Sequence, residues 1–585
     1  MKNFYLYFII SGFLILIVNF QDCSTDFGAI PRAEFPGTEI QSSTGTEILG
    51  ANSSLQVYPL SVPTHEYRFS VSGQTVKTKI IDTTFPLPEP QGYTIGLTVT
   101  PGEFEPATFV LRATANQSGI TISSSALLGP QGSQILPGSI DIKLVKTWYQ
   151  PSCGYDTSIS GKFLIPELLV KDDALIRNDF VHQTSSLRAR VNGLIKYVDV
   201  TTAGSVLPVG AIVDDATSLQ PFNLAANTNK QVWITLHPPL GTPAGIYNGF
   251  ITISVPGKQN TKVSLTVNVL PFTLSTSLIS QSIYYRGQLH DSCPTLDGDC
   301  KTATQLKADL INMRNHGILY PTVYQSIKDT TALTSHLALM ETVGLPRNRL
   351  YNMGDLLVYP TDPSNLAKVA NIVNNWNDFA KARGWGQVYF YGRDEARGTV
   401  FDSQLPIWDT VHQNGGKMFA SIPDAATAMR PTIVNIDVPV VYGTTNSTTA
   451  AADLASAVAQ LNSLSIKVFK YGEPFSGFEQ PEYERHYYGF SMLARGFSGA
   501  MNYAYQQKGY SWNDFEPTMQ NETYTYPGTT APIDTVQWEG HREGTDDIRY
   551  LSTLSAIKKW TKTQTDDYAK NLLANATQDP LKNRH

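Results

Sequence analysis

Charged residues are scarce in this sequence, at 16% of 585 residues compared with about 25% in an average soluble protein. There is no arginine-rich or lysine-rich run and the formal net charge is only −6, so we expect no nucleic-acid partner. The ten histidines form no H-E-x-x-H motif and no close pair, so we expect no metal site and no cofactor. G-x-S-x-G and the phosphate-binding glycine loop are also missing, which argues against a serine hydrolase and a nucleotide-binding protein.

Cysteine is rare as well, with four residues in the whole chain. Cys293 and Cys300 bracket the short loop CPTLDGDC, which an oxidising compartment would close as a disulfide. If Cys23 leaves with a cleaved signal, Cys153 has no partner. No Cys or His lies at ligand spacing around these thiols, which argues against a metal bound by them.

The N-terminal segment, residues 1–23, has Lys2 followed by an apolar run from Phe4 to Phe20. We interpret it as a secretory signal, with an uncleaved membrane anchor as the alternative. We therefore expect a secreted or extracellular glycoprotein. A membrane is a partner only if the N-terminal segment is retained. Five N-x-[ST] sequons fit this location; they begin at Asn52, Asn116, Asn446, Asn521 and Asn575.

Residues 28–275 contain short β-branched runs separated by Gly, Pro and Ser. Alternation of apolar and polar residues predicts strands at 105–113, 231–236, 249–255 and 262–270. We predict a β-sandwich domain here, with an appended subdomain around residues 150–200. Nothing in this half has a catalytic pattern.

Residues 276–562 change to alternating strand-like and helical segments. The clearest helix is expected from an N-cap at Asp362, with Pro363 at its first position, to about Arg383. Eight strands with intervening helices over this length predict a (β/α)8 TIM-like barrel, followed by a C-terminal tail, 563–585. The predicted barrel strands lie at 282–287, 318–324, 350–355, 387–392, 417–423, 438–443, 467–472 and 499–506.

Asp394 and Glu395 follow the fourth predicted strand, in the stretch QVYFYGRDEARG. Barrel enzymes carry their reactive groups at the carboxyl ends of the strands, and Gly392 is expected to let the chain turn so that both carboxylates face the mouth. Two adjacent carboxylates repel when both are ionised, an arrangement that suits a general acid paired with an ionised neighbour. Glu473, after the seventh strand, is a possible alternative nucleophile about 5 Å from such an acid.

Aromatic residues recur at the ends of the other predicted strands. An aromatic face with a polar edge suits a sugar ring, whose C–H faces are apolar and whose rim is hydroxylated. A glycan or glycoconjugate is therefore the expected partner. The residues predicted to contact it are Tyr391, Tyr471, Tyr503 and Trp538.

Several segments carry motifs of one known family. They are GEFEPATFVLRA (102–113), FLIPELLVKDD (163–173), VWITLHPPLGTPAGIYNGFITISV (232–255), DLINMRNHGI (309–318), YGRDEA (391–396), RHYYGFSMLARGFSGAMNYAY (485–505) and VQWEGHREGTDDIRYLSTL (536–554). On these residues the chain, from about 90 to 560, resembles glycoside hydrolase family 123 and its related uncharacterised barrel proteins. The family's carboxylate pair is often followed by Pro, whereas Ala396 follows it here.

Most of the last segment has a structural interpretation. We expect a final helix with its N-cap at Thr545, because Asp546 and Asp547 would then lie at the positive helix N-terminus. Arg485 and Arg542 are expected to be ion-paired scaffold residues rather than catalytic ones.

The resemblance implies an exo-acting β-N-acetylgalactosaminidase that uses the substrate's 2-acetamido group as nucleophile, with retention of configuration. Glu395 would protonate the leaving glycosidic oxygen, and Asp394 would hold the acetamido N–H. Two alternatives stay open. One is a conventional retaining glycosidase with Glu395 as acid/base and Glu473 as nucleophile, and the other is a non-catalytic carbohydrate-binding surface protein.

Overall fold

The structure is a computed structural model that describes residues 54–60, 67–71, 74–78, 93–151, 161–443, 448–477, 481–507, 512–515 and 522–578. Residues 40–570 form one compact unit, and residues 1–39 and 571–585 form another, of which only 571–578 are described. The predicted signal at 1–23 lies outside the described residues, as do Cys153 and the sequons at Asn52, Asn446 and Asn521.

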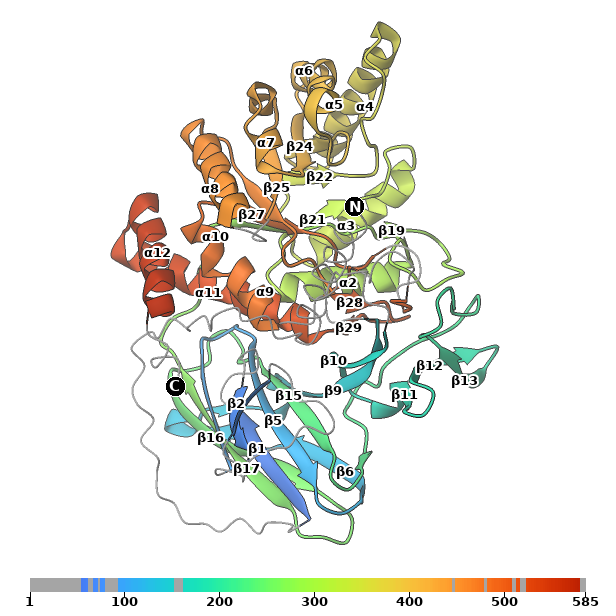
Figure 1. The fold of residues 1–585 in the computed structure, drawn as a ribbon, viewed down its shortest axis with the longest axis vertical. Coiled ribbons are helices and arrows are strands. Elements are labelled where there is room, and N and C mark those ends of the chain that lie inside the picture. Colours follow the sequence, from blue (N-terminus) through green and yellow to red (C-terminus); the bar gives the residue numbers. More distant parts are fainter. Residues whose placement is uncertain are drawn as a thin grey trace, which may run out of the picture. The chain divides into compact units, whose positions relative to one another are not determined.

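The N-terminal half consists of mainly antiparallel sheets (Figure 1, blue to green). One sheet has five antiparallel strands in the order β1 (Leu55–Leu60), β5 (Glu105–Ala113), β15 (Asn229–Leu236), β9 (Ile140–Gln150) and β10 (Phe163–Val170). A seven-stranded sheet runs β14 (Phe222–Leu224), β6 (Gln117–Ser124), β16 (Gly245–Ser254), β17 (Thr261–Val269) and β4 (Thr94–Val99), with β7 (Leu127–Leu128) and β8 (Gln134–Ile135) paired to its side. Smaller sheets are β11 (Ile176–Asp179), β12 (Thr184–Val191) and β13 (Leu194–Asp199), and the hairpin of β2 (Tyr67–Val71) and β3 (Gln74–Thr78).

Both large sheets contribute to one hydrophobic core. Phe109 and Leu144 of the five-stranded sheet belong to the same buried cluster as Ile251 and Leu265 of the seven-stranded sheet. Buried and less buried residues alternate along β4 and β17, as expected for strands with one face on a core. The four strands predicted here are confirmed, and the β-sandwich remains our interpretation of how the two sheets pack.

The C-terminal half contains a closed barrel of eight parallel strands. All eight lie where the sequence predicted strands, which confirms the TIM-like barrel. In order around it they are β18 (Ser280–Ile283), β21 (Tyr320–Val323), β22 (Arg349–Asn352), β23 (Gln387–Tyr391), β24 (Lys417–Ile422), β25 (Val438–Tyr442), β26 (Phe469–Tyr471) and β27 (Gly499–Asn502). Every residue of β26 and β27 is buried, because a parallel barrel strand is covered on both faces.

Helices accompany the barrel strands (Figure 1, green to red). α4 (Pro363–Ala382) confirms the predicted helix: the Asp362 side chain caps it by accepting from the backbone N–H groups of Ser364 and Asn365. The other helices are α2 (Ala303–Asn315), α3 (Thr330–Thr342), α5 (Gly398–Asp402), α6 (Leu405–Gln413), α7 (Ala425–Ala428), α8 (Thr448–Ser463), α9 (Pro481–Tyr488), α10 (Phe490–Ala494), α11 (Val536–Lys558) and α12 (Lys562–Gln578).

The connection that follows β27 returns to the N-terminal sheets. It contains the short strands β28 (Thr525–Tyr526) and β29 (Ile533–Asp534), and Tyr526 and Ile533 belong to the hydrophobic core of those sheets. Lys143 Nζ of β9 lies 2.8 Å from Asp534 Oδ2. The barrel and the sheets are therefore joined by buried apolar and ionic contacts within one compact unit.

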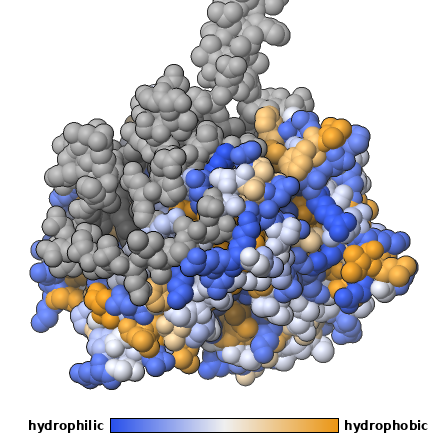
Figure 2. Space-filling model, turned by 90° about the horizontal axis from the view of Figure 1, so that it is seen from below, coloured by the Kyte–Doolittle hydropathy of each residue, from blue (hydrophilic) through white to orange (hydrophobic). Residues whose placement is uncertain are grey.

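The surface differs from the core in hydropathy. On the coloured part of the face in Figure 2, hydrophobic residues form small groups among hydrophilic ones. Exposed apolar residues scattered in this way are normal for a globular protein.

Candidate active site

Asp394 and Glu395 lie together at the carboxyl end of β23, and both are exposed. Glu395 has a φ of 43°, so the left-handed residue beside the pair is Glu395, whereas the sequence pattern indicated Gly392 as the residue at which the chain turns. At Gly392 a Cβ would lie 2.9 Å from Gln404 Oε1, so this side chain, which accepts from Arg393 N, would have to move. The carboxylate pair thus occupies a turn with little room on its inner side.

Tyr391, the last residue of β23, contacts Asp394. Its hydroxyl donates to Asp394 Oδ1 at 2.5 Å and lies 2.6 Å from Ser421 Oγ of β24. The Tyr284 hydroxyl, at the end of β18, lies 2.9 Å from the same Ser421 Oγ. A chain of three hydroxyls therefore runs from the barrel interior to Asp394.

Tyr471, the last residue of β26, contacts Glu395. Its hydroxyl donates to Glu395 Oε1 at 2.5 Å. Burial, followed by the contact with Glu395, raises the pKa of Tyr471 far above its usual range, and burial likewise raises the pKa of Tyr391 well above 10. Both phenols therefore keep their protons and act as donors to the carboxylates at any physiological pH.

These contacts change the role of two predicted sugar-binding residues. Tyr391 and Tyr471 are buried, at 2% and 4% exposure, so they support the carboxylates and present almost no ring surface. Tyr503, after β27, is only half-buried, and its ring lies 5.8 Å from that of Tyr284. Of these three tyrosines, Tyr503 has the surface that a ligand in the barrel mouth could touch.

Glu473 follows β26 at the same end of the barrel and is half-buried. Its Oε1 accepts from the Tyr442 hydroxyl at 3.4 Å. Lys470 Nζ lies 2.8 Å from the carbonyl oxygens of Gly472 and Glu473, which fixes the backbone of this turn. Glu473 is thus a third carboxylate at the carboxyl end of the barrel.

Glu522 is a fourth carboxylate there, and no sequence motif indicates it. Only 8% of the residue is exposed. Burial, together with the charge of Glu395, raises its pKa to about 8, and it also acts electrostatically on Tyr503. Asp355, after β22, is equally buried but accepts three hydrogen bonds, from Ser326 Oγ, Ile327 N and Trp376 Nε1. Glu522 differs from this structural carboxylate because its side chain has no hydrogen-bond partner among the described residues.

Trp538 does not lie at the mouth. It is fully buried in α11, its indole N–H donates to Asn312 Oδ1 at 2.8 Å, and its ring stacks on His316. The structure therefore gives it no surface for a sugar, and the interpretation of Trp538 as a sugar contact is wrong.

Helix α11 also begins earlier than predicted. The N-cap of α11 is Thr535, whose side chain accepts from Trp538 N, so Thr545 is an interior helix residue and the predicted N-cap is wrong. The scaffold role of the two arginines is confirmed, because Arg485 pairs with Glu543 and Asp547 and Arg542 pairs with Glu539.

The disulfide between Cys293 and Cys300 is present, which confirms that pairing. Asn116 is exposed, and its Oδ1 accepts from Ala226 N at 2.8 Å. Asn575 lies within α12. Within the described ranges, no helix has both the length and the apolar character that crossing a bilayer requires.

One group of side chains has the composition of a metal site. The ligand atoms of His316, Asp534 and Glu539 lie within 4.8 Å of one another in the core, although His316 is far from the other two in sequence. Both carboxylates already have cationic partners, since Lys143 pairs with Asp534 and Arg542 with Glu539. We therefore interpret the group as a buried ion-pair network rather than a metal centre.

No protein-family model matches the chain, and no curated protein matches it. Among solved structures, it is similar to a family 123 glycoside hydrolase from Clostridium perfringens, described for glycolipid glycan hydrolysis, with a TM-score of 0.61 and 12% identity over 90% of this chain and 99% of that one. Weaker matches include a Bacteroides ovatus GH5 xyloglucanase (TM-score 0.28, 9% identity, 78% of this chain and 98% of that one). Another is a GH2 β-galacturonidase from Eisenbergiella tayi (TM-score 0.32, 10% identity, 84% and 97%). The resemblance to family 123 is thus supported at the level of the fold.

Proposed function

We propose that this protein is a retaining glycoside hydrolase that removes terminal β-linked N-acetylhexosamine, with N-acetylgalactosamine as the preferred sugar. The observation that carries the proposal is the exposed Asp394–Glu395 pair at the carboxyl end of β23, with a tyrosine hydroxyl 2.5 Å from each carboxylate. The likeness of the fold to a family 123 glycoside hydrolase supports it.

Glu395 is the general acid in this proposal. Tyr471 donates to Oε1, so the proton that is transferred sits on Oε2. As the bond between the anomeric carbon and the glycosidic oxygen breaks, that proton passes to the leaving oxygen. In the second step the ionised Glu395 takes a proton from the attacking water, which restores the acid.

Asp394 acts on the acetamido group of the substrate. Its carboxylate accepts the acetamido N–H, which makes the carbonyl oxygen of that group more nucleophilic. This oxygen attacks the anomeric carbon and forms a ring, which water then opens at the same carbon. Two inversions at one carbon give net retention, and no enzyme nucleophile is needed.

The tyrosines hold the two carboxylates in place. A phenol hydroxyl at 2.5 Å fixes the rotamer of an acidic side chain. A catalytic carboxylate that is held in this way stays in its reactive position, and a misplaced one would lower the reaction rate. Tyr503 is the residue that we propose as a sugar contact, because its ring is half-buried beside Tyr284.

A second candidate function is a conventional retaining glycosidase. It is favoured by the place of Glu473 at the same end of the barrel, where it could serve as nucleophile. This enzyme would need no acetamido group and would cleave a plain β-galactoside.

The test is hydrolysis of aryl β-GalNAc, β-GlcNAc and β-galactoside by the wild type and by Glu395→Gln, Asp394→Asn and Glu473→Gln. We expect cleavage of the acetamido sugars alone. Glu395→Gln should abolish turnover of substrates with a poor leaving group, because no acid remains to protonate the departing oxygen. Asp394→Asn should reduce turnover far more than binding.

Other outcomes have distinct meanings. Cleavage of the plain galactoside that is lost in Glu473→Gln would favour the conventional mechanism. No cleavage of any of the three sugars, with binding on a glycan array, would favour a carbohydrate-binding protein.

We further propose that the chain is secreted, with residues 1–23 as the signal; the alternative is an N-terminal membrane anchor. The support is the apolar run after Lys2 together with the disulfide in the barrel. N-terminal sequencing of the protein from culture medium and from the membrane fraction would distinguish the two.

A further inference from the structure

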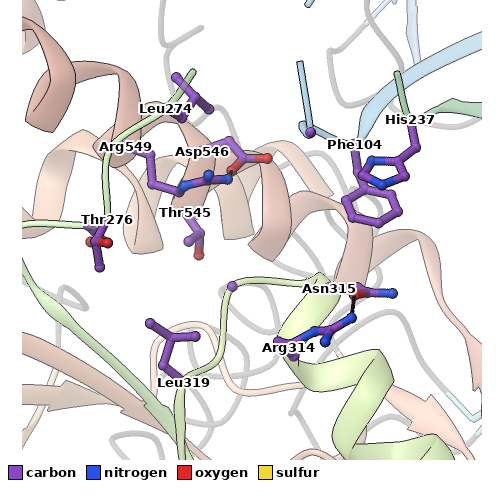
Figure 3. Close-up of a pocket in the computed structure, with 13 residues that line it drawn as sticks. Phe104, His237, Leu274, Thr276, Arg314, Asn315, Leu319, Thr545, Asp546 and Arg549 are labelled. Carbon is purple, nitrogen blue, oxygen red and sulfur yellow. Dashed lines mark hydrogen bonds and ion pairs between the residues drawn. The ribbon is translucent and has the colours of Figure 1, made fainter. Parts of the chain in front are cut away.

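A cavity of about 370 Å³ lies at the opposite end of the barrel from the carboxylate pair (Figure 3). Ser277 and Leu319 in its wall come just before β18 and β21, whereas Asp394 and Glu395 follow the end of β23. The N-terminal sheets supply the other side of the wall. The full lining is Gly102, Phe104, His237, Leu274, Thr276, Ser277, Arg314, Asn315, Gly317, Leu319, Thr545, Asp546 and Arg549.

The cavity contains an arginine that no carboxylate neutralises within the described part of the chain. Arg314, an exposed residue near the end of α2, donates only to neutral oxygens: Val343 O at 2.7 Å and Asn315 Oδ1 at 3.1 Å. A guanidinium has five N–H donors, so three remain for another partner. Arg549 is different, because it pairs with Asp546 at 2.6 Å. Of the two arginines in the lining, Arg549 is therefore balanced by Asp546, and the positive charge of Arg314 is not balanced by a carboxylate of the lining.

Further donors and a flat apolar surface lie beside Arg314. Asn315 Nδ2 makes no hydrogen bond with any described residue. The rings of Phe104 and His237 stack at 3.8 Å with an angle of 5° between them. In Figure 3 this stack faces the cavity from one side, with Arg314 and Asn315 below it and Thr545 of α11 across from them. Thr545 Oγ1 is buried without a hydrogen-bond partner in the described structure.

We propose that this cavity binds a small ligand that carries an oxyanion, either a carboxylate or a phosphate. Arg314 and Asn315 would hold the anion, and the rest of the ligand would lie against the Phe104–His237 stack. The volume suits a ligand of monosaccharide size. Asp546 repels an anion, but its pairing with Arg549 weakens that repulsion at short range.

The position of the site implies a consequence for stability. Phe104 and His237 flank β5 and β15 of the N-terminal sheets, while Arg314 and Asn315 belong to α2 of the barrel. A ligand that contacts both binds the assembled fold and not the unfolded chain, so it raises the melting temperature in a concentration-dependent way. This inference does not depend on the proposed hydrolase activity.

The experiment is a thermal melt of the full chain in inorganic phosphate, sodium D-glucuronate or glucose, at constant ionic strength set with sodium chloride. We expect a saturable rise in melting temperature with phosphate, with glucuronate or with both, and none with glucose. Phosphate alone would identify a phosphorylated ligand and glucuronate alone a carboxylated one. No saturable rise with either anion would overturn the proposal.

Variants locate the binding. Arg314→Gln should weaken the apparent affinity about tenfold or more, because a charge-assisted contact is lost. Asn315→Ala leaves the Arg314–Val343 contact in place and should weaken the apparent affinity for the anion less than Arg314→Gln does. It serves as a second test if Arg314→Gln folds poorly. Arg347→Gln, at an exposed arginine outside the cavity, is the matched control. Unchanged affinity in both cavity variants, or an equal loss in the control, would refute the site.

Discussion

Replacing Glu522 by Gln should make the protein more stable at pH 8 and leave its stability nearly unchanged at pH 4.5. The carboxyl is 8% exposed, and burial beside Glu395 raises its pKa from 4.5 to about 8. The pKa of Glu522 is higher in the folded state than in the unfolded state. Its neutral carboxyl therefore costs the fold nothing below about pH 4.5, and the free energy of unfolding falls as pH rises from there through 8. A glutamine has nearly the same shape and cannot ionise.

The magnitude follows from the same two values. Each pKa unit corresponds to about 1.4 kcal/mol, so the interval from 4.5 to 8 gives an upper limit of about 5 kcal/mol at alkaline pH. Local relaxation and water entry reduce this value, so we expect a difference of about 2–5 kcal/mol between variant and wild type at pH 8.

The assay is urea unfolding of both proteins at intervals of one pH unit from 4.5 to 8.5, followed by tryptophan fluorescence. Asp409→Asn, at an exposed carboxylate of α6, controls for the general effect of removing a negative charge. The expected result is a free-energy difference that grows with pH for Glu522→Gln alone. A difference that stays constant over this range would refute the argument that Glu522 is buried in its neutral form.

Two further predictions concern the barrel mouth and its loop. Tyr471→Phe removes the hydroxyl that donates to Glu395 Oε1, and a hydrogen bond to a charged group contributes about 1.5–3 kcal/mol, so kcat should fall roughly 10-fold to 100-fold with little change in KM. Steady-state kinetics on whichever of the three aryl sugars the wild type hydrolyses would check this. An unchanged kcat would mean that Glu395 does not need the hydrogen bond from Tyr471. Replacing Cys293 and Cys300 together by Ser should lower the free energy of unfolding by about 2 kcal/mol, as expected for a loop closed across seven residues. Equal urea midpoints for the variant and the oxidised wild type would contradict it.

The barrel could be predicted from the sequence because its strands have a strong local signal. The run of β23 lies between Gly386 and Gly392, that of β25 ends before Gly443, and both are mostly β-branched or aromatic, as is typical of strands that are covered on both faces. The place of Asp394 and Glu395 then follows from topology alone, since parallel strands bring their carboxyl ends to one face.

Residues whose roles depend on tertiary packing could not be predicted in this way. The first turns of α11 contain Gly540 and Gly544, which weaken a helix, yet they are helical and buried, and Arg485 and Arg542 pair with acidic residues there. Trp538 was placed at the mouth because aromatics near strand ends suit sugars, but its side chain faces the core. Glu522 lies about twenty residues beyond the end of β27, so nothing in its local sequence indicates that it lies beside Glu395.

The direction of the hydrogen bonds around Asp394 gives the site its chemical polarity. A phenol has one proton, and the Tyr391 hydroxyl lies 2.5 Å from Asp394 Oδ1 and 2.6 Å from Ser421 Oγ. If Tyr391 donates to the carboxylate, Ser421 must donate to Tyr391, and Tyr284 in turn must donate to Ser421. All three hydroxyl protons are then donated along the chain towards Asp394 Oδ1, which accepts the last of them. A substrate group that meets this carboxylate must therefore be a donor, and the acetamido N–H of the proposed mechanism is such a donor.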